Sequence, residues 1–170
     1  MTERPPTDGA ARSGDLSPER RALLERLQRG GAALAPASCA QERFWFLEQL
    51  EPGNPAHHVA GRLRLDGPVD AEVLARAVAF LVQRHEVLRT TFTGSGRPQQ
   101  VIGPPFAPPL PLHDLRALDP AARDAARDAH RDAVVLPPFD LRRGPVLRKV
   151  LLRLDDARWE YLWCLHHVAV

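Results

Sequence analysis

The stretch VLRKVLLRLDDARWEYLWCLHH, residues 146–167, consists of two apolar runs separated by the polar segment DDAR. Both runs are rich in branched aliphatic or aromatic residues, which favour β-strands, and a short polar segment suffices to reverse the chain between two strands. The stretch therefore predicts two consecutive strands joined by a turn. A sheet built on such strands needs helices to cover it, and the sequence upstream must supply them.

The second predicted strand ends on two adjacent histidines. Side chains alternate between the faces of a strand, so His167 would share a face with Trp163 and Leu165, and His166 would share the other with Cys164. We expect His166 to be held in the core by hydrogen bonds and His167 to face a cleft. A histidine side chain, with an unperturbed pKa of about 6.5, can accept a proton from an attacking amine or alcohol. A purely structural strand-end histidine is the alternative.

Helical and strand-like patterns follow one another irregularly upstream. Ser38 and Gln41 have the spacing of a capping box, which predicts a helix over 36–50, and Asp70 is the expected N-cap of a helix that runs through Leu88. Strands are predicted over 58–65 and 89–93, a turn into another short strand over 94–102, an extended proline-rich loop over 104–111, and a helix over 120–134. This mixture predicts an α/β fold of the α+β type, a two-layer sandwich of helices on a sheet.

The first thirty residues differ in composition from the rest of the chain. Residues 1–15 are rich in Pro, Gly, Ser, Thr and charged residues and offer little to bury, so we expect a disordered leader. Residues 16–31 carry the signals of a short helix, with Ser17 as N-cap, Pro18 at the first helical position and two glycines as the stop. We predict an N-terminal docking or linker helix there, followed by one domain over residues 36–170.

Length, charge and hydropathy limit the possible functions. The chain has 170 residues, of which 44% are hydrophobic, and this is enough for a packed core. Its net charge is only +2, and arginines alternate with acidic residues, so we do not expect nucleic-acid binding. No secretory signal and no apolar run near the ~18 residues of a membrane span are visible, which predicts a cytoplasmic protein without membrane contact.

Other candidate groups have ordinary structural interpretations. Adjacent histidines on a strand diverge, and no Asp, Glu or Cys stands at a usual ligand spacing from them, so we expect no metal site. Cys39 and Cys164 lie far apart in the sequence and are predicted to be reduced, buried thiols. His57 and His58 follow a turn and have no obvious partner, which favours surface loop histidines.

Three short segments match motifs of one enzyme family when they are read in order. The matching residues are Ser38, Ala40, Gln41 and Arg43 for S-x-A-Q-x-R, Arg84, His85, Glu86, Leu88, Arg89, Thr90 and Phe92 for R-H-E-x-L-R-T-x-F, and His166 and His167 for the start of H-H-x-x-x-D-G. PFDLRRGPVLRKVLLRL is similar to the stretch that usually precedes the last motif. In this order, the segments resemble the condensation domain of nonribosomal peptide synthetases over about Ser38 to Val170.

The resemblance implies a fold like that of chloramphenicol acetyltransferase, in which two similar subdomains enclose the active site. By this resemblance we expect the chain to correspond to the N-terminal subdomain alone, without the C-terminal subdomain. The resemblance also implies amide bond formation between a donor thioester on an upstream peptidyl carrier protein and an aminoacyl acceptor on a downstream one. The carriers hold 4'-phosphopantetheine arms, so the domain itself would need no bound cofactor. An adenylation domain of the same synthetase is a further implied partner.

Carried over to this sequence, the resemblance makes His167 the catalytic residue, placed nearest to the attacking amine. Whether it removes the amine proton or mainly positions the amine stays open. The site-supporting residues that the resemblance implies are His166, Ser38, Gln41, Arg43, Arg84, His85 and Arg89. The Asp and Gly of the last motif would be the next two residues after Val170, so we expect this polypeptide by itself to be inactive.

Two other functions stay open at this point. A stand-alone carrier-dependent acyltransferase of the same fold would use the histidine motif to move an acyl group to an alcohol or a small amine. A non-catalytic module that only docks a carrier protein would keep the fold without turnover. A following adenylation domain would favour the synthetase, whereas carrier binding without turnover would favour the docking module.

Overall fold

The computed structural model describes residues 21, 25, 31–94 and 96–170. The predicted leader and the predicted N-terminal helix therefore lie outside the described residues, apart from Arg21, Glu25 and Gly31. Residues Ala33–Val170 form a compact unit. This unit contains every motif to which the sequence points.

The unit mixes helices and strands in the predicted order. Its helices are α2 (Cys39–Leu50), α3 (Ala71–Arg84) and α4 (Pro120–Val135), and its 3₁₀ turns are η1 (Pro55–His57), η2 (Glu86–Arg89) and η3 (His167–Ala169). Its strands are β1 (Ala33–Pro36), β2 (His58–Asp66), β3 (Thr90–Thr93), β4 (Gln99–Ile102), β5 (Leu112–Asp114), β6 (Leu147–Arg153) and β7 (Arg158–His166). No helix in the described residues combines the length and the apolar character that crossing a bilayer requires.

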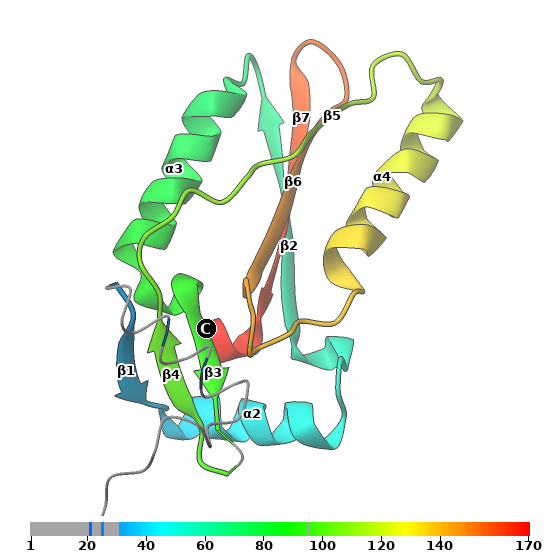
Figure 1. Cartoon of the computed structure of the whole chain (residues 1–170). Coiled ribbons are helices and arrows are strands. Elements are labelled where there is room, and N and C mark those ends of the chain that lie inside the picture. Colours follow the sequence, from blue (N-terminus) through cyan, green and yellow to red (C-terminus); the bar gives the residue numbers. More distant parts are fainter. Residues whose placement is uncertain (1–20, 22–24, 26–30, 95) are drawn as a thin grey trace, which may run out of the picture. The chain divides into compact units, whose positions relative to one another are not determined.

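The strands form two sheets, and the larger one carries the histidine motif at its end. The order in the larger sheet is β2-β7-β6-β5, where β5 runs parallel to β6 and the other neighbours are antiparallel. The smaller sheet is antiparallel with the order β1-β4-β3. Figure 1 shows α4 on one side of the larger sheet and α3 on the other. The predicted pair of consecutive strands is thus confirmed as β6 and β7, and the α/β class is confirmed with them.

The main hydrophobic core lies on the α4 side of the larger sheet. Alternating residues of β6 and β7 supply its sheet half, and α2, α4, β3 and the loop before β6 supply the rest. The buried members are Trp45, Phe92, Leu115, Val134, Phe139, Leu141, Val146, Val150, Leu152, Leu162, Cys164 and Val168. Val168 of η3 is one of them, so the turn that follows the two histidines is anchored by apolar burial.

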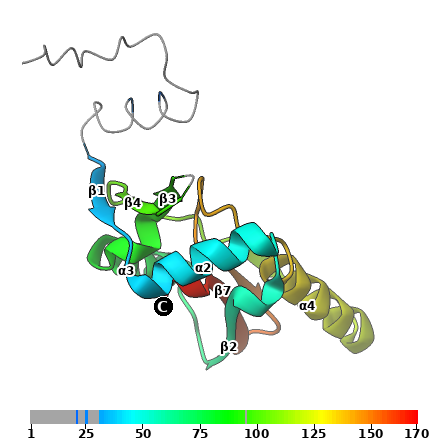
Figure 2. The ribbon, with the colours of Figure 1, turned by 90° about the horizontal axis from the view of Figure 1, so that it is seen from below.

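Helix α2 begins at the predicted capping box and brings several site residues together. The Ser38 hydroxyl accepts the Gln41 N–H at 3.2 Å, and the Gln41 side-chain oxygen accepts the Ser38 N–H at 2.9 Å. The box satisfies two amides that would otherwise lack partners in the first turn. Figure 2, viewed from below, shows α2 lying across the end of the sheet, with the C-terminal turn beside it.

The helix that Asp70 caps is shorter than the sequence predicts. The Asp70 side chain accepts the N–H groups of Glu72 and Val73, as expected, but α3 ends at Arg84. His85 is already extended, with φ −105° and ψ 99°, and its carbonyl accepts the Leu88 N–H at 3.0 Å. The helical spacing of Leu88 was therefore misleading, because the chain tightens into η2 before it enters β3.

The last strand also ends one residue earlier than predicted. His166 is the final residue of β7 and pairs with His58, whereas His167 opens η3. The His166 side chain accepts the Val168 N–H, and this local bond turns the backbone away from the strand. The prediction that His167 continues the face of Trp163 and Leu165 is wrong for this reason.

Gly61 offers a test of the packing on the α3 side of the sheet. It lies opposite Trp163 in the β2–β7 register, and a Cβ atom at Gly61 would lie 2.4 Å from Cζ2 of the indole. We predict that Gly61→Ala lowers the free energy of unfolding by about 1–3 kcal/mol, because the indole must shift from its packed position. Denaturant unfolding followed by tryptophan fluorescence measures this loss.

Gly96→Ala is the matched control, because a Cβ atom there has no neighbour within 4 Å. Its free energy of unfolding should stay within about 0.5 kcal/mol of the parent protein. Equal losses in the two variants would contradict a packing role for Gly61.

Candidate functional site

His167 lies at the first position of η3, just past the end of β7. Its side chain is exposed, and its ring stacks on Phe44 of α2 with ring centroids 4.6 Å apart and planes 20° from parallel. Such stacking restrains the plane of a ring and leaves its edge free. Its ring makes no hydrogen bond to any other described residue. His167 is therefore an imidazole with a restrained plane and an accessible edge.

His166, the neighbouring residue, is completely buried. Its Nδ1 atom accepts the Val168 N–H at 3.0 Å, and its own backbone N–H donates to the Val146 carbonyl at 3.1 Å. Burial and, to a lesser degree, the nearby His58 and His57 lower the pKa of His166 to about 4. The ring is thus neutral near pH 7, in agreement with the core position expected for it.

Two further side chains converge on the buried ring of His166. Glu48 of α2 places its Oε2 atom 3.6 Å from His166 Nε2 and 3.8 Å from Nδ1 of His57, which ends η1. The other carboxylate oxygen of Glu48 accepts the Gly53 N–H at 2.7 Å. His57 Nδ1 and His166 Nε2 are both buried and have no hydrogen-bond partner in the described part of the chain. One carboxylate oxygen is therefore the nearest acceptor to two unpartnered imidazole nitrogens.

The Glu48, His57 and His166 cluster has the composition of a metal site, since three ligand atoms lie within 4.8 Å of one another. The hydrogen bond from Val168 argues against this use. It requires a lone pair on Nδ1 of His166, so the single proton of the neutral ring is on Nε2, the atom that a metal would need. Two ligands would remain, fewer than the three protein ligands of a catalytic zinc site.

His57 and His58 are not surface histidines, contrary to the sequence-based interpretation. The His57 side chain is only 12% exposed and meets the rings of Phe44 and His166 edge-on. The Nδ1 atom of His58 donates to the Val135 carbonyl at 2.6 Å, and burial is the main cause that lowers its pKa. The reason is tertiary: η1 folds back toward α2, and His58 starts the strand that pairs with β7.

The residues of the first motif hold the start of α2. Besides its capping bond, Gln41 donates from its side-chain amide to Gln100 of β4 at 3.1 Å, so it connects α2 with the smaller sheet. Arg43 is exposed and makes no ion pair within the described residues. Ser38 and Gln41 thus support the helix that carries Phe44, whereas no contact ties Arg43 to the histidines.

The second motif lies at the end of α3 and the start of β3. Arg84 and His85 are exposed. Arg89 is mostly buried, and its guanidinium donates to the Gly103 carbonyl and to the Glu86 carboxylate. The Gly103 N–H in turn donates to the Arg89 carbonyl at 3.0 Å, so η2 is fastened to the residue that follows β4. The structure therefore gives Arg89 a clear architectural contact but brings none of these three residues into contact with His166 or His167.

Phe44 and Glu48 are the site residues that the sequence interpretation missed. They stand four positions apart on α2, so they share one face of the helix, and that face meets His166 and His167. This spacing was visible in the sequence. What the spacing could not reveal is that the C-terminal turn lies against this face.

The two cysteines differ in their surroundings. Cys164 is fully buried in β7, and burial raises the pKa of its thiol, as expected for a core residue. Cys39 is exposed at the first position of α2, so the prediction of a buried thiol is wrong there. Its neighbours Ser38 and Ala40 are exposed too, so the start of α2 lies at the surface.

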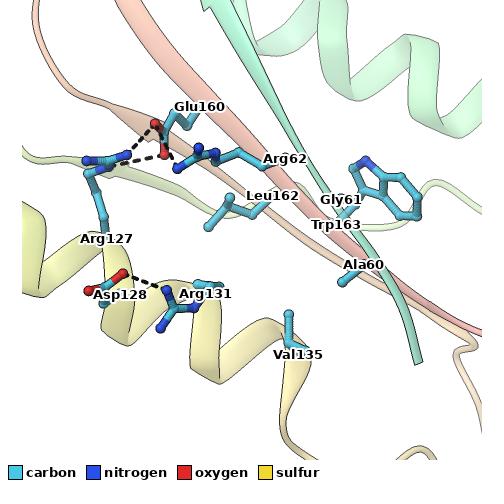
Figure 3. Close-up of a pocket in the computed structure, with 10 residues that line it drawn as sticks. All are labelled: Ala60, Gly61, Arg62, Arg127, Asp128, Arg131, Val135, Glu160, Leu162 and Trp163. Atoms are coloured by element: carbon cyan, nitrogen blue, oxygen red, sulfur yellow. Dashed lines mark hydrogen bonds and ion pairs between the residues drawn. The ribbon is translucent and has the colours of Figure 1, made fainter. Parts of the chain in front are cut away.

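A separate pocket of about 450 Å³ lies between β2, β7 and α4. Figure 3 shows Arg127 and Arg62 both facing Glu160, and Arg131 facing Asp128. Arg127 holds Glu160 through two hydrogen bonds of 2.7 and 3.2 Å, Arg62 lies 3.9 Å from the same carboxylate, and Arg131 bonds Asp128 at 2.8 Å. Because these charges are already satisfied by one another, the pocket has no group poised for chemistry, and the histidine turn is the better candidate site.

The lowered pKa of His166 predicts a pH-dependent stability. Between about pH 4 and the ordinary value of 6.5, the unfolded chain binds a proton on this residue more readily than the folded chain does. The stabilisation is complete above about pH 6.5 and is lost as the pH falls toward 4, by about 3 kcal/mol at most. Unfolding free energies of the parent chain and of His166→Gln, measured from pH 7.5 to 4.5, should converge at low pH. A constant difference between the two proteins would contradict the assignment.

The ion pairs in the pocket beside α4 predict that two arginine substitutions on α4 lower the free energy of unfolding by different amounts. The Glu160 side chain is 8% exposed, so Arg127→Met should cost about 1–3 kcal/mol of unfolding free energy by leaving a buried carboxylate without its main donor. Arg131→Met should cost less than about 0.5 kcal/mol, since its partners Asp128 and Asp132 are 66% and 49% exposed. Thermal unfolding compares the two variants, and equal losses would refute this ranking.

Known proteins resemble the chain in sequence. The family model described as "Condensation domain" matches residues 32–170. The phosphinothricin tripeptide synthetase PhsC of Streptomyces viridochromogenes is 42% identical over 176 residues, which cover 94% of this chain and 16% of that protein. The chondramide synthase cmdD of Chondromyces crocatus is 44% identical over 138 residues, covering 81% of this chain and 4% of that protein. The chain thus spans a small part of the curated relatives it matches.

Solved structures agree with the sequence relatives. The starter condensation domain of the rhizomide synthetase RzmA matches with a TM-score of 0.71 and 29% identity, over 80% of this chain and 34% of that one. The first condensation domain of the CDA synthetase matches with a TM-score of 0.67 and 27% identity, over 79% of this chain and 34% of that one. The fold therefore belongs to a known architecture, and the chain is a member of the condensation-domain family of nonribosomal peptide synthetases.

Proposed function

We propose that this chain supplies the histidine half of a condensation site, in which His167 serves amide bond formation. The donor is an acyl or peptidyl thioester on one carrier protein, and the acceptor is an aminoacyl group on another. The observation that carries the proposal is the contrast between an exposed, stacked His167 and a buried, neutral His166 on adjacent positions. One histidine is available to substrate, and the other holds the turn.

The chemical step needs one accessible imidazole lone pair. The acceptor amine attacks the thioester carbonyl, a C–N bond forms and the C–S bond breaks, and the proton lost by the amine is taken up on the way to the free thiol. His167 either accepts this proton or holds the amine through a hydrogen bond so that its lone pair points at the carbonyl carbon. The stack on Phe44 supports both roles, because it restrains the ring plane without covering the ring edge.

The carrier proteins are the proposed partners. Their 4'-phosphopantetheine arms would bring both reacting groups to His167 as substrate, and an adenylation domain would load the acceptor amino acid. That the curated relatives are synthetases much longer than this chain supports such partners. Because the chain corresponds to about a third of each solved condensation domain, we propose that turnover needs the remaining part and that these 170 residues alone are inactive.

The catalytic prediction concerns His167 in a protein that carries this chain with the rest of the domain. His167→Ala should lower the rate of amide formation by about 100-fold or more, because the attacking amine loses its proton acceptor or its hydrogen-bond partner. Mass spectrometry of the acceptor carrier under single-turnover conditions measures the dipeptidyl product. His113→Ala, at an exposed position on β5, is the matched control and should keep the parental rate.

A folded His167→Ala protein with the parental rate would refute the catalytic assignment. Carrier binding without product in the parent protein would instead favour a docking module. Transfer of the acyl group to a free alcohol or small amine, with no use of a carrier-bound acceptor, would favour a stand-alone acyltransferase.

A further inference from the structure

The carboxylate of Glu48 is buried beside the two histidines and belongs to none of the sequence motifs. We propose that Glu48 is a positioning residue: its charge fixes which nitrogen of His166 carries the proton, and this choice holds the turn that presents His167. The effect on the turn follows from the contacts alone. The effect on amide formation rests on the proposed function.

The position of Glu48 is itself well determined. Its side chain is 12% exposed, and Oε1 is held by the Gly53 N–H at 2.7 Å, which leaves Oε2 directed at the histidines. The distances to His166 Nε2 and His57 Nδ1, 3.6 and 3.8 Å, exceed those of hydrogen bonds but allow strong charge interaction in a buried setting. A carboxylate near Nε2 favours a proton on that atom, because the N–H dipole then points at negative charge.

The opposite edge of the His166 ring shows why this choice matters. Nδ1 must be free of a proton to accept the Val168 N–H, and the bond is buried from water. If the proton moved to Nδ1, two N–H groups would face each other across 3.0 Å and the bond would be lost. Glu48 therefore acts on one side of the ring, and the backbone of η3 responds on the other.

The turn transmits this restraint to His167. His167 lies between His166, which accepts the bond, and Val168, which donates it and is 2% exposed in the core. In the described residues the ring of His167 makes no hydrogen bond, and its ring contact is the stack on Phe44, one helical turn before Glu48 on α2. One face of α2 thus restrains His167 twice, directly through a ring and indirectly through a charge.

Glu48→Gln tests the proposal with almost no change of shape. If the amide oxygen keeps the Gly53 N–H, the amide NH₂ faces His166 Nε2 and donates to it. This favours the proton on Nδ1, the tautomer that cannot accept the Val168 N–H. We expect the variant to fold, to shift the His166 tautomer, and to lower kcat about 10- to 100-fold with little change in the KM for either carrier substrate.

The experiment uses a protein that carries this chain with the rest of the domain. Nitrogen-15 NMR of labelled histidine rings identifies the protonated nitrogen of His166, whose signals are assigned by their loss in His166→Gln. Steady-state rates are measured on the same samples. Glu51→Gln is the matched control, because Glu51 follows three residues later, is exposed, and contacts Asn54 instead of a histidine. It should keep both the tautomer and kcat of the parent.

Three outcomes would overturn the proposal. The first is a parental tautomer of His166 in Glu48→Gln. The second is a shifted tautomer with unchanged kcat, which would remove the positioning role. The third is tight binding of Zn²⁺ by the parent that Glu48→Gln abolishes, since zinc on Nε2 requires the other tautomer. If His167→Ala keeps the parental rate, the proposed function fails by itself, and the tautomer measurement still decides what Glu48 does.

Discussion

The buried hydrogen bond from the Val168 amide to Nδ1 of His166 is the constraint on which the site depends. It ends β7, starts η3 and separates two adjacent histidines into one buried ring and one exposed ring. If this bond broke, a buried donor and a buried acceptor would remain without partners and without hydration, which is costly in free energy. The bond therefore resists fraying even near a strand end. The bond fits only the tautomer of His166 that carries its proton on Nε2, and this tautomer argues against a metal site at the cluster with Glu48 and His57.

Helix α2 links this constraint to the rest of the fold. Its capping box fixes the first turn, Gln41 connects it with the smaller sheet, and Trp45 buries it in the core on the α4 side of the larger sheet. The face that remains carries Phe44 and Glu48, which meet the exposed and the buried histidine respectively. The S-x-A-Q motif thus acts indirectly. Its residues do not contact the histidines, but they hold the helix that presents Phe44 and Glu48.

The charged pocket beside α4 shows how ion pairs can resemble a binding site. Three arginines in a hollow suggest an anion site, yet each faces a carboxylate at 2.7 to 3.9 Å. Buried and half-buried charges need such partners to offset their lost hydration. The histidine turn differs because its exposed imidazole has no polar partner among the described residues, and an unpaired group of this kind is what a substrate can use.

The sequence by itself determined the class of fold, the order of the elements and the family. Local signals were sufficient for this: the capping box at Ser38, the N-cap at Asp70, the prolines of the loop over 104–111, and the alternation along β6 and β7 are all read from neighbours in the chain. Motif order also pointed to His167, and the alternation of side chains along the strand pointed to the buried position of His166. Only the tertiary structure decided that α3 ends before His85, that His167 leaves the strand, and that His57 and Glu48 close around His166. The cluster arises where segments distant in sequence meet, because a carboxylate gains a role only when folding brings it within about 4 Å of a ring that lacks a partner. The strand end rests on a bond that spans only two residues, but the ring that accepts this bond is buried by the fold, and local pattern does not reveal that burial.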